Sequence, residues 1–334
     1  MTESIRVYLI TTEWPSAENP SAVPFLSRHV RLLRESGVEV EVFHFRGKQN
    51  PFNYLIAWWR IRHTAFWKKA DILHAHWGQS AFLALFSKKK LVITYHGSDL
   101  HGIVDQKGKK TLNGRILSTF SRLIARRADC CIAVSNQIAQ LLSGKCKNIK
   151  IIPIGIDTGL FFPMDKITCR RRLNLDVHAK IVLFISDPNR TEKRFPLARD
   201  AVNEFQKLHP DIPVQLQVVY GIDYSSIPYY INSGDALILT STHEGSPTVV
   251  KEALACKVPI VSFNVGDVAE RIADIDGCYL CESQTIECLV KGLEVAIEQG
   301  PIGNLPATAI KNLDERDNVS EVIEIYKTLL KDNN

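Results

Sequence analysis

Two glutamates, Glu244 and Glu252, bracket a Gly-Ser-Pro turn and the start of an apolar run in the segment STHEGSPTVVKEALAC. Burying a carboxylate without a partner is costly, so this pair must either face water or hold a ligand. A carboxylate can accept two hydrogen bonds side by side, which matches the vicinal diol of a ribose or a hexose. In an arbitrary sequence, two such glutamates are most often a solvated helix residue and a loop charge. Their chemistry therefore depends on the residues around them.

The residues between the two glutamates predict a helix N-terminus that can bind an anion. The segment follows the apolar run DALILTS, so it occupies a strand-to-helix turn. Ser246 is expected to be the N-cap and Pro247 the first helical residue. The amides of Thr248 and Val249 then remain among the unpaired donors at the positive end of the helix dipole. Phosphate is the usual ligand of such a site.

The elements that position these residues are predicted to be parallel strands alternating with helices. Runs rich in β-branched or aromatic residues are typical of strands, and helical patterns fill the gaps between them. Eleven strands are too many for one core, so we expect two doubly wound α/β domains, which would bind ligands at the carboxyl ends of their strands. The predicted strands are residues 5–11, 38–45, 71–77, 91–97, 130–135, 149–155, 180–186, 214–220, 235–241, 259–264 and 277–281.

A domain boundary is expected after the segment IPIGIDTGLFFPMD, where Pro and Gly cluster, which gives domains of residues 1–162 and 163–334. The last helix can pack back on the first domain. The charge balance changes sign near the same place. Residues 1–160 carry 23 Lys and Arg against 11 Asp and Glu, a balance of +12, whereas residues 161–334 carry 18 against 25, a balance of −7. A basic half indicates an anionic partner, and the absence of a nucleic-acid-binding motif favours phosphate or a membrane surface.

The composition is typical of a globular protein, with 45% hydrophobic and 23% charged residues among 334. No apolar run reaches the ~20 residues of a membrane-spanning helix, and the N-terminus has no signal-peptide pattern, so a cytoplasmic location is expected. The eight cysteines fit that compartment. Cys130 and Cys131 are expected in the core, and the pair Cys278 and Cys281 lacks the second ligand pair that zinc would need.

The segment EGSPTVVKEALACKVPIVSFNVGDVAERI resembles the donor-binding segment of the retaining family-four glycosyltransferases. The resemblance covers the glutamate pair, the A-C-x-x-P-I-V strand and the glycine of NVGD, and weaker agreement extends to HGSDL, AVS and IPIGID in the first half. It implies the GT-B fold, in which two Rossmann-like domains face each other across a cleft. Residues 1–162 would then bind the acceptor, and residues 163–334 the nucleotide-sugar donor.

The resemblance also implies a role for each residue of the turn. The donor sugar is expected to contact Glu244, Gly245 and Ser246, and the ribose to contact Glu252. The family holds the diphosphate with an Arg and a Lys, which match Arg190 and Lys193 of the basic turn DPNRTEKRF, with Arg194 as a competitor for the second role. The residues expected at the diphosphate are Arg190, Lys193, Ser246, Pro247, Thr248 and Val249, and those expected at the nucleobase are Tyr220, Gly221 and Ile222.

In the first half, family members carry a histidine in the H-G-x-D context close to the donor sugar and the acceptor. The resemblance therefore assigns His96 to the reaction centre, where Asp99 would orient it or cap the next turn. The expected catalytic residues are His96, Asp99 and Glu244. Ser21, Ala22 and Ser135 are expected on the acceptor side, although the loop that holds Ser21 and Ala22 lacks the glycine pair of many relatives.

Residues 46–69 interleave basic residues with three tryptophans, Trp58, Trp59 and Trp67. This pattern fits two interpretations equally well. On a helix, the tryptophans could form a membrane-surface face, with Arg60, Arg62, Lys68 and Lys69 meeting anionic lipid or a polyprenyl-linked acceptor. Alternatively, the segment is an amphipathic core helix with a solvated basic side.

The sequence as a whole predicts a retaining glycosyltransferase that moves a hexose-type sugar from a nucleotide diphosphate to a glycan or lipid-linked glycan in polysaccharide biosynthesis. Neither a metal nor another cofactor is expected, since the family generally works without one, and the Asp274-Ile275-Asp276 segment is interpreted as a loop. The alternatives are a nucleotide-sugar 2-epimerase of the same fold, which needs no acceptor, a phosphorylase, and a two-domain binding protein without chemistry.

Overall fold

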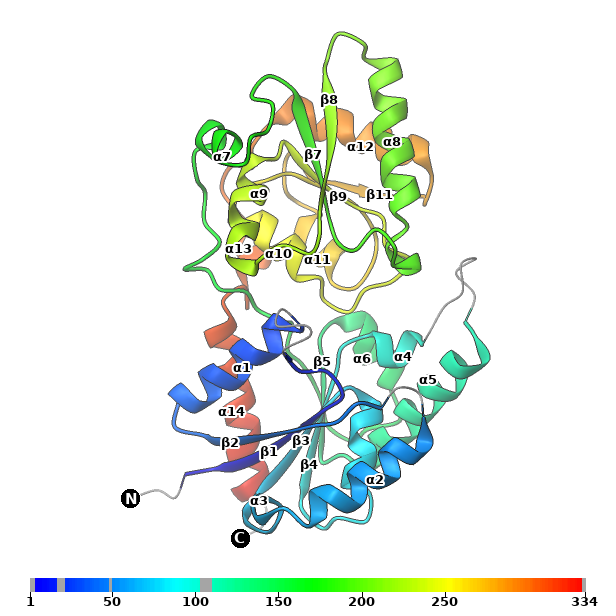
Figure 1. Ribbon diagram of the computed structural model, residues 1–334, viewed down its shortest axis with the longest axis vertical. Coiled ribbons are helices and arrows are strands. Elements are labelled where there is room, and N and C mark those ends of the chain that lie inside the picture. The colour runs from blue at the N-terminus through cyan, green and yellow to red at the C-terminus, as the bar shows by residue number, and fades with distance from the viewer. Residues whose placement is uncertain (1–3, 17–21, 48–49, 103–109, 332–334) are drawn as a thin grey trace. The chain divides into compact units, whose positions relative to one another are not determined.

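The computed structural model describes residues 4–16, 22–47, 50–102 and 110–331 (Figure 1). These residues form two compact units. Unit 2 consists of residues 155–314, and unit 1 of the described residues before and after it. The division falls between Ile154 and Gly155, so residues 155–162, which the sequence placed in the first domain, belong to unit 2. The chain returns to unit 1 at Glu315.

Each unit is built on one parallel sheet, and all eleven predicted strands are found among the described residues. Unit 1 has the strand order β2-β1-β3-β4-β5-β6, and unit 2 has the order β11-β10-β9-β7-β8. The strands are β1 (Arg6–Thr11), β2 (Glu39–His44), β3 (Ile72–His76), β4 (Lys90–Tyr95), β5 (Cys130–Ala133), β6 (Ile149–Ile151), β7 (Lys180–Ile185), β8 (Val214–Val219), β9 (Ala236–Leu239), β10 (Ile260–Phe263) and β11 (Tyr279–Cys281).

Helices cover both faces of the unit 1 sheet, because side chains of a strand alternate between its faces. Val7 and Leu9 of β1 pack in one core with α1 and α14, whereas Tyr8 and Ile10 pack in the other core, which includes residues of α2. The helical elements of unit 1 are α1 (Pro24–Glu35), α2 (Pro51–Arg62), α3 (Ala65–Lys69), η1 (Gly78–Ala84), α4 (Ser98–His101), α5 (Leu112–Ile124), η2 (Ala125–Arg127), α6 (Asn136–Leu142) and α14 (Glu315–Lys331).

Helix α14 packs beside α1, although nearly 300 residues of chain separate them, as Figure 1 shows in red and blue. Val319, Val322 and Tyr326 of α14 are buried in the core that α1 shares. At the start of α14, Glu315 accepts a hydrogen bond from Arg28 Nε at 2.6 Å, and both side chains are almost fully buried. The end of the chain is therefore an integral part of unit 1.

Unit 2 has one continuous core around its five strands. Cys256 and Cys281 are buried in it, and Cys130 and Cys131 are buried in unit 1, as the sequence predicted for the latter pair. The helical elements of unit 2 are α7 (Lys166–Arg172), η3 (Thr191–Lys193), α8 (Phe195–Leu208), η4 (Tyr224–Ser226), α9 (Ile227–Ser233), α10 (Thr248–Ala255), α11 (Val268–Ile272), α12 (Ile286–Gln299) and α13 (Ala307–Ile310). Asp274 and Asp276 lie in an exposed turn after α11, as expected.

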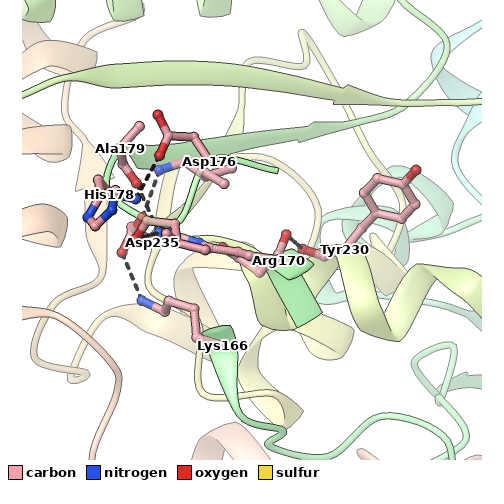
Figure 2. A network of polar contacts seen from close by, with 10 residues as sticks. Lys166, Arg170, Asp176, His178, Ala179, Tyr230 and Asp235 are labelled. Carbon is pink, nitrogen blue, oxygen red and sulfur yellow. Dashed lines mark hydrogen bonds and ion pairs between the residues drawn. The ribbon is translucent and has the colours of Figure 1, made fainter. Parts of the chain in front are cut away.

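A buried ionic network ties α7 to the amino ends of β7 and β9 (Figure 2). Asp235 accepts the Arg170 guanidinium, the Ile181 amide at 2.7 Å and Lys166 Nζ at 2.8 Å. Burial alone would raise the pKa of Asp235, but the bond to Lys166, the amide and the two cations outweigh it and lower the pKa. Arg170 also donates to the carbonyl oxygens of Ser233 and Ala179. The network fixes this edge of the sheet, opposite to the carboxyl ends of the strands.

Candidate functional site

The two predicted donor-binding turns of unit 2 are joined at the carboxyl ends of β7 and β9. These strands are neighbours, and the sheet continues to β8 on one side and to β10 on the other. The strand order therefore reverses direction between β7 and β9, and such a topological switch point is where open α/β sheets bind ligands. Lys193 Nζ, from the turn after β7, lies 2.5 Å from Glu244 Oε1 in the turn after β9. Ser241 Oγ donates to the same carboxylate oxygen at 2.6 Å. Both side chains of the ion pair are only 15% exposed.

Further bonds involving the backbone hold these two turns together. Thr240 Oγ1 donates to the carbonyl oxygen of Lys193 at 2.7 Å, and the amide of Thr242 donates to the carbonyl oxygen of Glu192 at 2.8 Å. The position of Lys193 relative to Glu244 is therefore set by the backbone as well as by their own charges.

A third turn, which follows β10, packs directly against the turn that holds Glu244. Gly266 has φ of +59°, a conformation that favours glycine, and a Cβ at this position would lie 2.7 Å from the carbonyl oxygen of Gly245. Only glycine fits this close approach. The glycine of the NVGD segment thus has a steric reason in this chain, because it allows the turn after β10 to pack against Gly245.

Helix α10 begins one residue later than the sequence predicted. Its first helical residue is Thr248, and Pro247 is the N-cap, which has no side-chain capping bond. The prediction that Ser246 caps the helix is wrong, because the Ser246 hydroxyl points inward and donates to Asp267 Oδ2 at 3.0 Å. Thr248 and Val249 are still the first residues of the helix, so their amides lie at its positive end.

Glu252 projects from the second turn of α10 and is only 4% exposed. Its Oε1 accepts a hydrogen bond from the Tyr224 hydroxyl at 3.0 Å. Tyr224 lies in η4, shortly after the predicted nucleobase residues Tyr220, Gly221 and Ile222, of which Tyr220 is 58% exposed and Gly221 has φ of +69°. The turn after β8 therefore reaches Glu252 through a residue that sequence reasoning did not single out.

The two remaining arginines of the basic turn differ in what they contact. The Arg190 side chain is 55% exposed and pairs with Glu192 next to it in the turn. The Arg194 guanidinium donates instead to the carbonyl oxygens of Thr240 at 2.7 Å and Ser241 at 3.1 Å, and it stacks on the Phe263 ring. Arg194 thus has a structural role at the strand ends, which favours Lys193 over Arg194 as the second cation.

In unit 1, His96 follows β4 and packs among aromatic rings. Its ring is stacked on that of His76, with 5.2 Å between the centroids, and lies 4.7 Å from Trp77 and 5.2 Å from Phe25. His96 Nε2 is 3.0 Å from His76 Nδ1, whereas His96 Nδ1 is buried with no hydrogen-bond partner among the described residues. Burial lowers the pKa of His96 to about 3, so the ring is neutral.

Asp99 does not orient His96 through its side chain. The Asp99 carboxylate is fully buried and accepts the amides of Gly78 at 2.8 Å and Gly97 at 3.0 Å. Burial raises its pKa to about 6, although these backbone bonds act in the opposite direction. Asp99 does not cap α4 either, since that helix has no side-chain cap, and its carboxylate instead joins the backbone at Gly78 and Gly97. His76 is the residue that contacts the His96 ring.

Behind His96, three more histidines of unit 1 lie close together. Ring nitrogens of His29, His74 and His76 lie within 4.8 Å of one another, which is close enough for three ligands of one metal ion. Both nitrogens of His74 are occupied, however, by Tyr326 Oη at 2.5 Å and Thr94 Oγ1 at 2.8 Å. A metal would have to displace one of these bonds.

The predicted acceptor-side residues are spread over unit 1. Ser135 is buried and caps α6, since its side chain accepts the amide of Ile138 at 3.3 Å. Ala22 is half-buried just before α1, and Ser21 lies outside the described residues. Within the described part of the chain, neither Ser135 nor Ala22 has a contact that marks it as a binding residue.

Of the three tryptophans in residues 46–69, only Trp59 is exposed. Trp58 and Trp67 pack on the core, and the Arg62 guanidinium lies over both rings, at 3.8 Å and 5.0 Å from their centroids. Arg62 also donates to the carbonyl oxygens of Trp58 and Leu83. The predicted face of three tryptophans with Arg62 is therefore wrong. The outer side of α2 instead exposes Phe52, Leu55, Ile56 and Trp59.

Comparison with known proteins gives two family matches. Residues 2–160 match the family described as Glycosyltransferase Family 4, and residues 176–316 match Glycosyl transferases group 1. The chain is 22% identical over 329 residues to N-acetyl-alpha-D-glucosaminyl L-malate synthase of Bacillus anthracis, which covers 88% of this chain and 83% of that protein. It is 28% identical over 225 residues to the putative teichuronic acid biosynthesis glycosyltransferase TuaC of Bacillus subtilis, covering 60% of this chain and 54% of that protein.

Solved structures show the same fold. Sucrose-phosphate synthase from Thermosynechococcus elongatus superposes with a TM-score of 0.75 at 14% identity, covering 98% of this chain and all of that one. HepE of Anabaena, solved in complex with UDP and glucose, gives a TM-score of 0.66 at 16% identity with the same coverage. These neighbours have the GT-B architecture of two Rossmann-like domains. With one family match in each half and this fold, the chain belongs to the group 1 glycosyltransferases of the GT-B class.

Proposed function

We propose that this glycosyltransferase moves a hexose-type sugar from a nucleotide diphosphate to a hydroxyl of a glycan or lipid-linked glycan, with retention of the anomeric configuration and without a metal ion. The main support is the ion pair of Lys193 and Glu244 at the switch point of the unit 2 sheet. It brings a cation, a carboxylate and the amino end of α10 to one place, as a nucleotide sugar with its anionic diphosphate and its diol-bearing rings requires.

In this proposal the donor lies along the carboxyl ends of the unit 2 strands. Arg190, Lys193 and the amides at the start of α10 hold the diphosphate, Glu244 contacts the sugar, and Glu252 contacts the ribose. These cations and amides stabilise the departing diphosphate, which is the role a metal has in other transferases. His96 of unit 1 acts at the reaction centre as a neutral donor or acceptor of hydrogen bonds, because burial keeps its pKa far below 7.

The reaction itself tests the proposal. Purified protein would be incubated with UDP-, GDP- and ADP-activated hexoses and a lipid-linked glycan extract, with and without EDTA, and the product's anomeric coupling constant would be measured by NMR. The proposal predicts transfer with the donor's anomeric configuration and no effect of EDTA. Inverted product would contradict retention, loss of activity in EDTA would contradict metal independence, and an epimerised nucleotide sugar formed without acceptor would support the 2-epimerase alternative.

A second proposal concerns the acceptor: unit 1 binds the surface of an anionic membrane through α2 and α5. Phe52, Leu55, Ile56 and Trp59 follow the i, i+3, i+4, i+7 spacing of one helix face, and all are exposed, Phe52 to 71%. No helix among the described residues has the length and hydropathy to cross a bilayer. An exposed apolar stripe of this kind fits the interfacial region of a membrane, where it would lie parallel to the surface.

Helix α5 extends the same surface. The rings of Tyr54 in α2, Phe82 in η1 and Phe120 in α5 form a continuous row, with 6.1 Å between successive centroids, so both helices flank η1. Outward, α5 exposes Leu112, Ile116 and Leu123. Residues 46–128 carry 16 Lys and Arg but only three Asp and no Glu. A basic segment with exposed apolar side chains complements acidic lipid, at about 1 kcal/mol for each Lys or Arg near the surface.

Sedimentation with liposomes tests this second proposal. We expect binding to vesicles of phosphatidylglycerol and phosphatidylcholine that is weakened by high salt, and weaker binding when Phe52 and Trp59 are replaced by Ser. The matched control is Leu208→Ser, which removes an equally exposed apolar side chain from unit 2. Absence of binding to acidic vesicles at low salt, or an equal loss in the control, would contradict it.

A further inference from the structure

The donor-binding turn rests on a buried lysine that the proposed function does not use. Lys251 is fully buried in α10, with no exposed side-chain surface. Side chains of a helix point toward its N-terminus, so Lys251 reaches back under the turn of residues 244–247. Its Nζ contacts the Ser246 hydroxyl and lies 3.2 Å from Asp267 Oδ2, in the turn after β10. A buried ammonium is costly unless it is paired, which makes this position unusual in an apolar helix.

Asp267 is shared between two cations. Arg271 Nε lies 3.4 Å from the same Oδ2 atom, and Arg271 Nη1 donates to the carbonyl oxygens of Ala309 at 3.0 Å and Lys311 at 2.6 Å. Asp267 Oδ1 is buried and has no hydrogen-bond partner among the described residues. Arg271 is therefore anchored independently of Lys251, so that Asp267 would keep a partner without it.

Ser246 is committed to this network. Its hydroxyl proton goes to Asp267 Oδ2, and its oxygen is contacted by Lys251 Nζ, so the hydroxyl cannot at the same time donate to a phosphate. With the side chain of Ser246 fixed inward and Gly266 packed on Gly245, the backbone amides are the donors that this turn can offer to an anion. The predicted contact of Ser246 with the donor would therefore have to come from its backbone.

We propose that Lys251 is a positioning residue for the donor diphosphate, which locks Ser246 and places a positive charge behind the amino end of α10. This inference rests on the proposed function, because it assumes that a diphosphate binds at this turn. Lys251 acts from inside the protein and does not touch the ligand. Its charge adds to the helix dipole in a region of low dielectric, where charges interact more strongly than in water.

The protonation of Lys251 gives a signature that a purely structural lysine would lack. Burial lowers the pKa of Lys251 to about 8, while Asp267 and Glu252 oppose that shift and Arg271 adds to it. A bound diphosphate favours the charged form and raises this pKa. Diphosphate binding should therefore be strongest below about pH 8 and weaken as the pH rises above 8. The terminal phosphate of a nucleoside diphosphate has its last pKa at ~6, below this range, and comparison with a variant that lacks Lys251 accounts for ligand groups that do titrate above pH 8.

The experiment compares the wild-type protein with Lys251→Met, which keeps an unbranched side chain one atom shorter and removes its charge. Dissociation constants for UDP, GDP, ADP and inorganic pyrophosphate would be measured by calorimetry from pH 7 to 9.5. We expect Lys251→Met to bind the preferred diphosphate at least about tenfold more weakly at pH 7. We also expect its affinity to fall less than that of the wild type between pH 7 and pH 9.5.

Controls separate positioning from folding and from the proposed function. Lys257→Met removes a lysine just beyond the other end of α10, where Nζ contacts the Gly303 carbonyl oxygen, and should bind as the wild type does. Asp267→Asn provides a second variant if Lys251→Met does not fold, and should change the pH profile while Lys251 remains. If the wild type binds a diphosphate, and Lys251→Met and Asp267→Asn bind it with the same affinity and pH profile, this inference alone would be overturned. A wild type that binds none of the probes would overturn the proposed function as well.

Discussion

Lys193 and Glu244 form an ion pair of 2.5 Å between the turns after β7 and β9, and each side chain is only 15% exposed. The carboxylate is thus paired with the cation that the proposal gives to the diphosphate. A bound donor would take Lys193 partly away from Glu244 and leave Glu244 able to contact the sugar. The pair would therefore link diphosphate binding to sugar binding within unit 2.

We expect Lys193→Met and Glu244→Gln each to lower kcat/KM by about 100-fold or more, which corresponds to ~2.7 kcal/mol of transition-state stabilisation. Because the two residues share one interaction, the double variant should be no worse than the poorer single variant. Steady-state kinetics of all three would show this. Lys207→Met, which breaks an exposed ion pair with Glu204, is the matched control and should have wild-type rates. Losses that simply add would contradict the coupling.

Arg190 should contribute less than Lys193, although both are expected at the diphosphate. Its side chain is 55% exposed, so solvent and salt screen its charge. Arg190→Ala is expected to raise the Kd for the diphosphate by a modest factor that shrinks at high salt, whereas the loss in Lys193→Met should persist. Calorimetric titrations at low and high ionic strength would compare them. If Arg190→Ala raised the Kd more than Lys193→Met did, and independently of salt, Arg190 would be the more important of the two residues.

Glu252 and Tyr224 should recognise the ribose. Tyr224→Phe removes the 3.0 Å hydrogen bond to Glu252 and should weaken nucleotide binding by about 0.5–1.5 kcal/mol, the usual contribution of one such bond. Wild-type protein should prefer the ribonucleotide to its deoxyribose analogue, and Glu252→Gln should lose much of that preference. Competition titrations with the two nucleotides would measure this preference in both proteins. Equal discrimination in the wild type and in Glu252→Gln would exclude the ribose contact.

Unit 1 should lose stability when the pH falls below about 6.5. Burial lowers the pKa of His29 to about 4 and that of His96 to about 3, and it holds His74 and His76 well below their ordinary value. Unfolding frees these rings to bind protons, so their contribution is fully present above the ordinary pKa of ~6.5 and is lost as the pH falls toward 4.

Tryptophan fluorescence can follow this effect, since all five tryptophans belong to unit 1. Urea unfolding at pH 7.5 and at pH 5 should give a lower free energy of unfolding at pH 5. Replacing His29 by Gln should reduce the difference between the two values. A free energy of unfolding that is the same at both pH values would show that the histidines titrate normally.

The stability of unit 2 should depend on the network around Asp235. Arg170→Met leaves Asp235 buried with Lys166 as its only cation, and breaking a buried pair in this way costs about 3–5 kcal/mol. We expect a correspondingly lower midpoint of thermal unfolding for unit 2, with donor-site residues unchanged in position because the network lies at the opposite edge of the sheet. Scanning calorimetry would measure the unfolding midpoint of Arg170→Met. Arg199→Met, which breaks an exposed ion pair with Asp200, is the control and should change the midpoint little.

The sequence predicted the strands well, because parallel strands covered on both faces are continuous apolar runs with recognisable ends. It also placed Lys193 and Glu244 in turns that follow strands, and the structure shows that these two strands are neighbours. It could not predict contacts that depend on the packing of several turns. Lys251 looks like a solvated cation in TVVKEALAC, and only the approach of Asp267 shows that it is buried. Likewise, the sequence of residues 46–69 fits a membrane face and a core helix equally well, and only the packing shows that Trp58 and Trp67 lie on the core with Arg62 over both rings.

The most direct test of the central claim, that unit 2 holds a nucleoside diphosphate between Lys193, Glu252 and the start of α10, is a calorimetric titration with UDP, GDP and ADP of the wild type and of Lys193→Met. The account predicts saturable binding of at least one of these nucleotides to the wild type and a large loss of affinity in the variant. Absence of binding to all three, or binding that the variant retains in full, would contradict it.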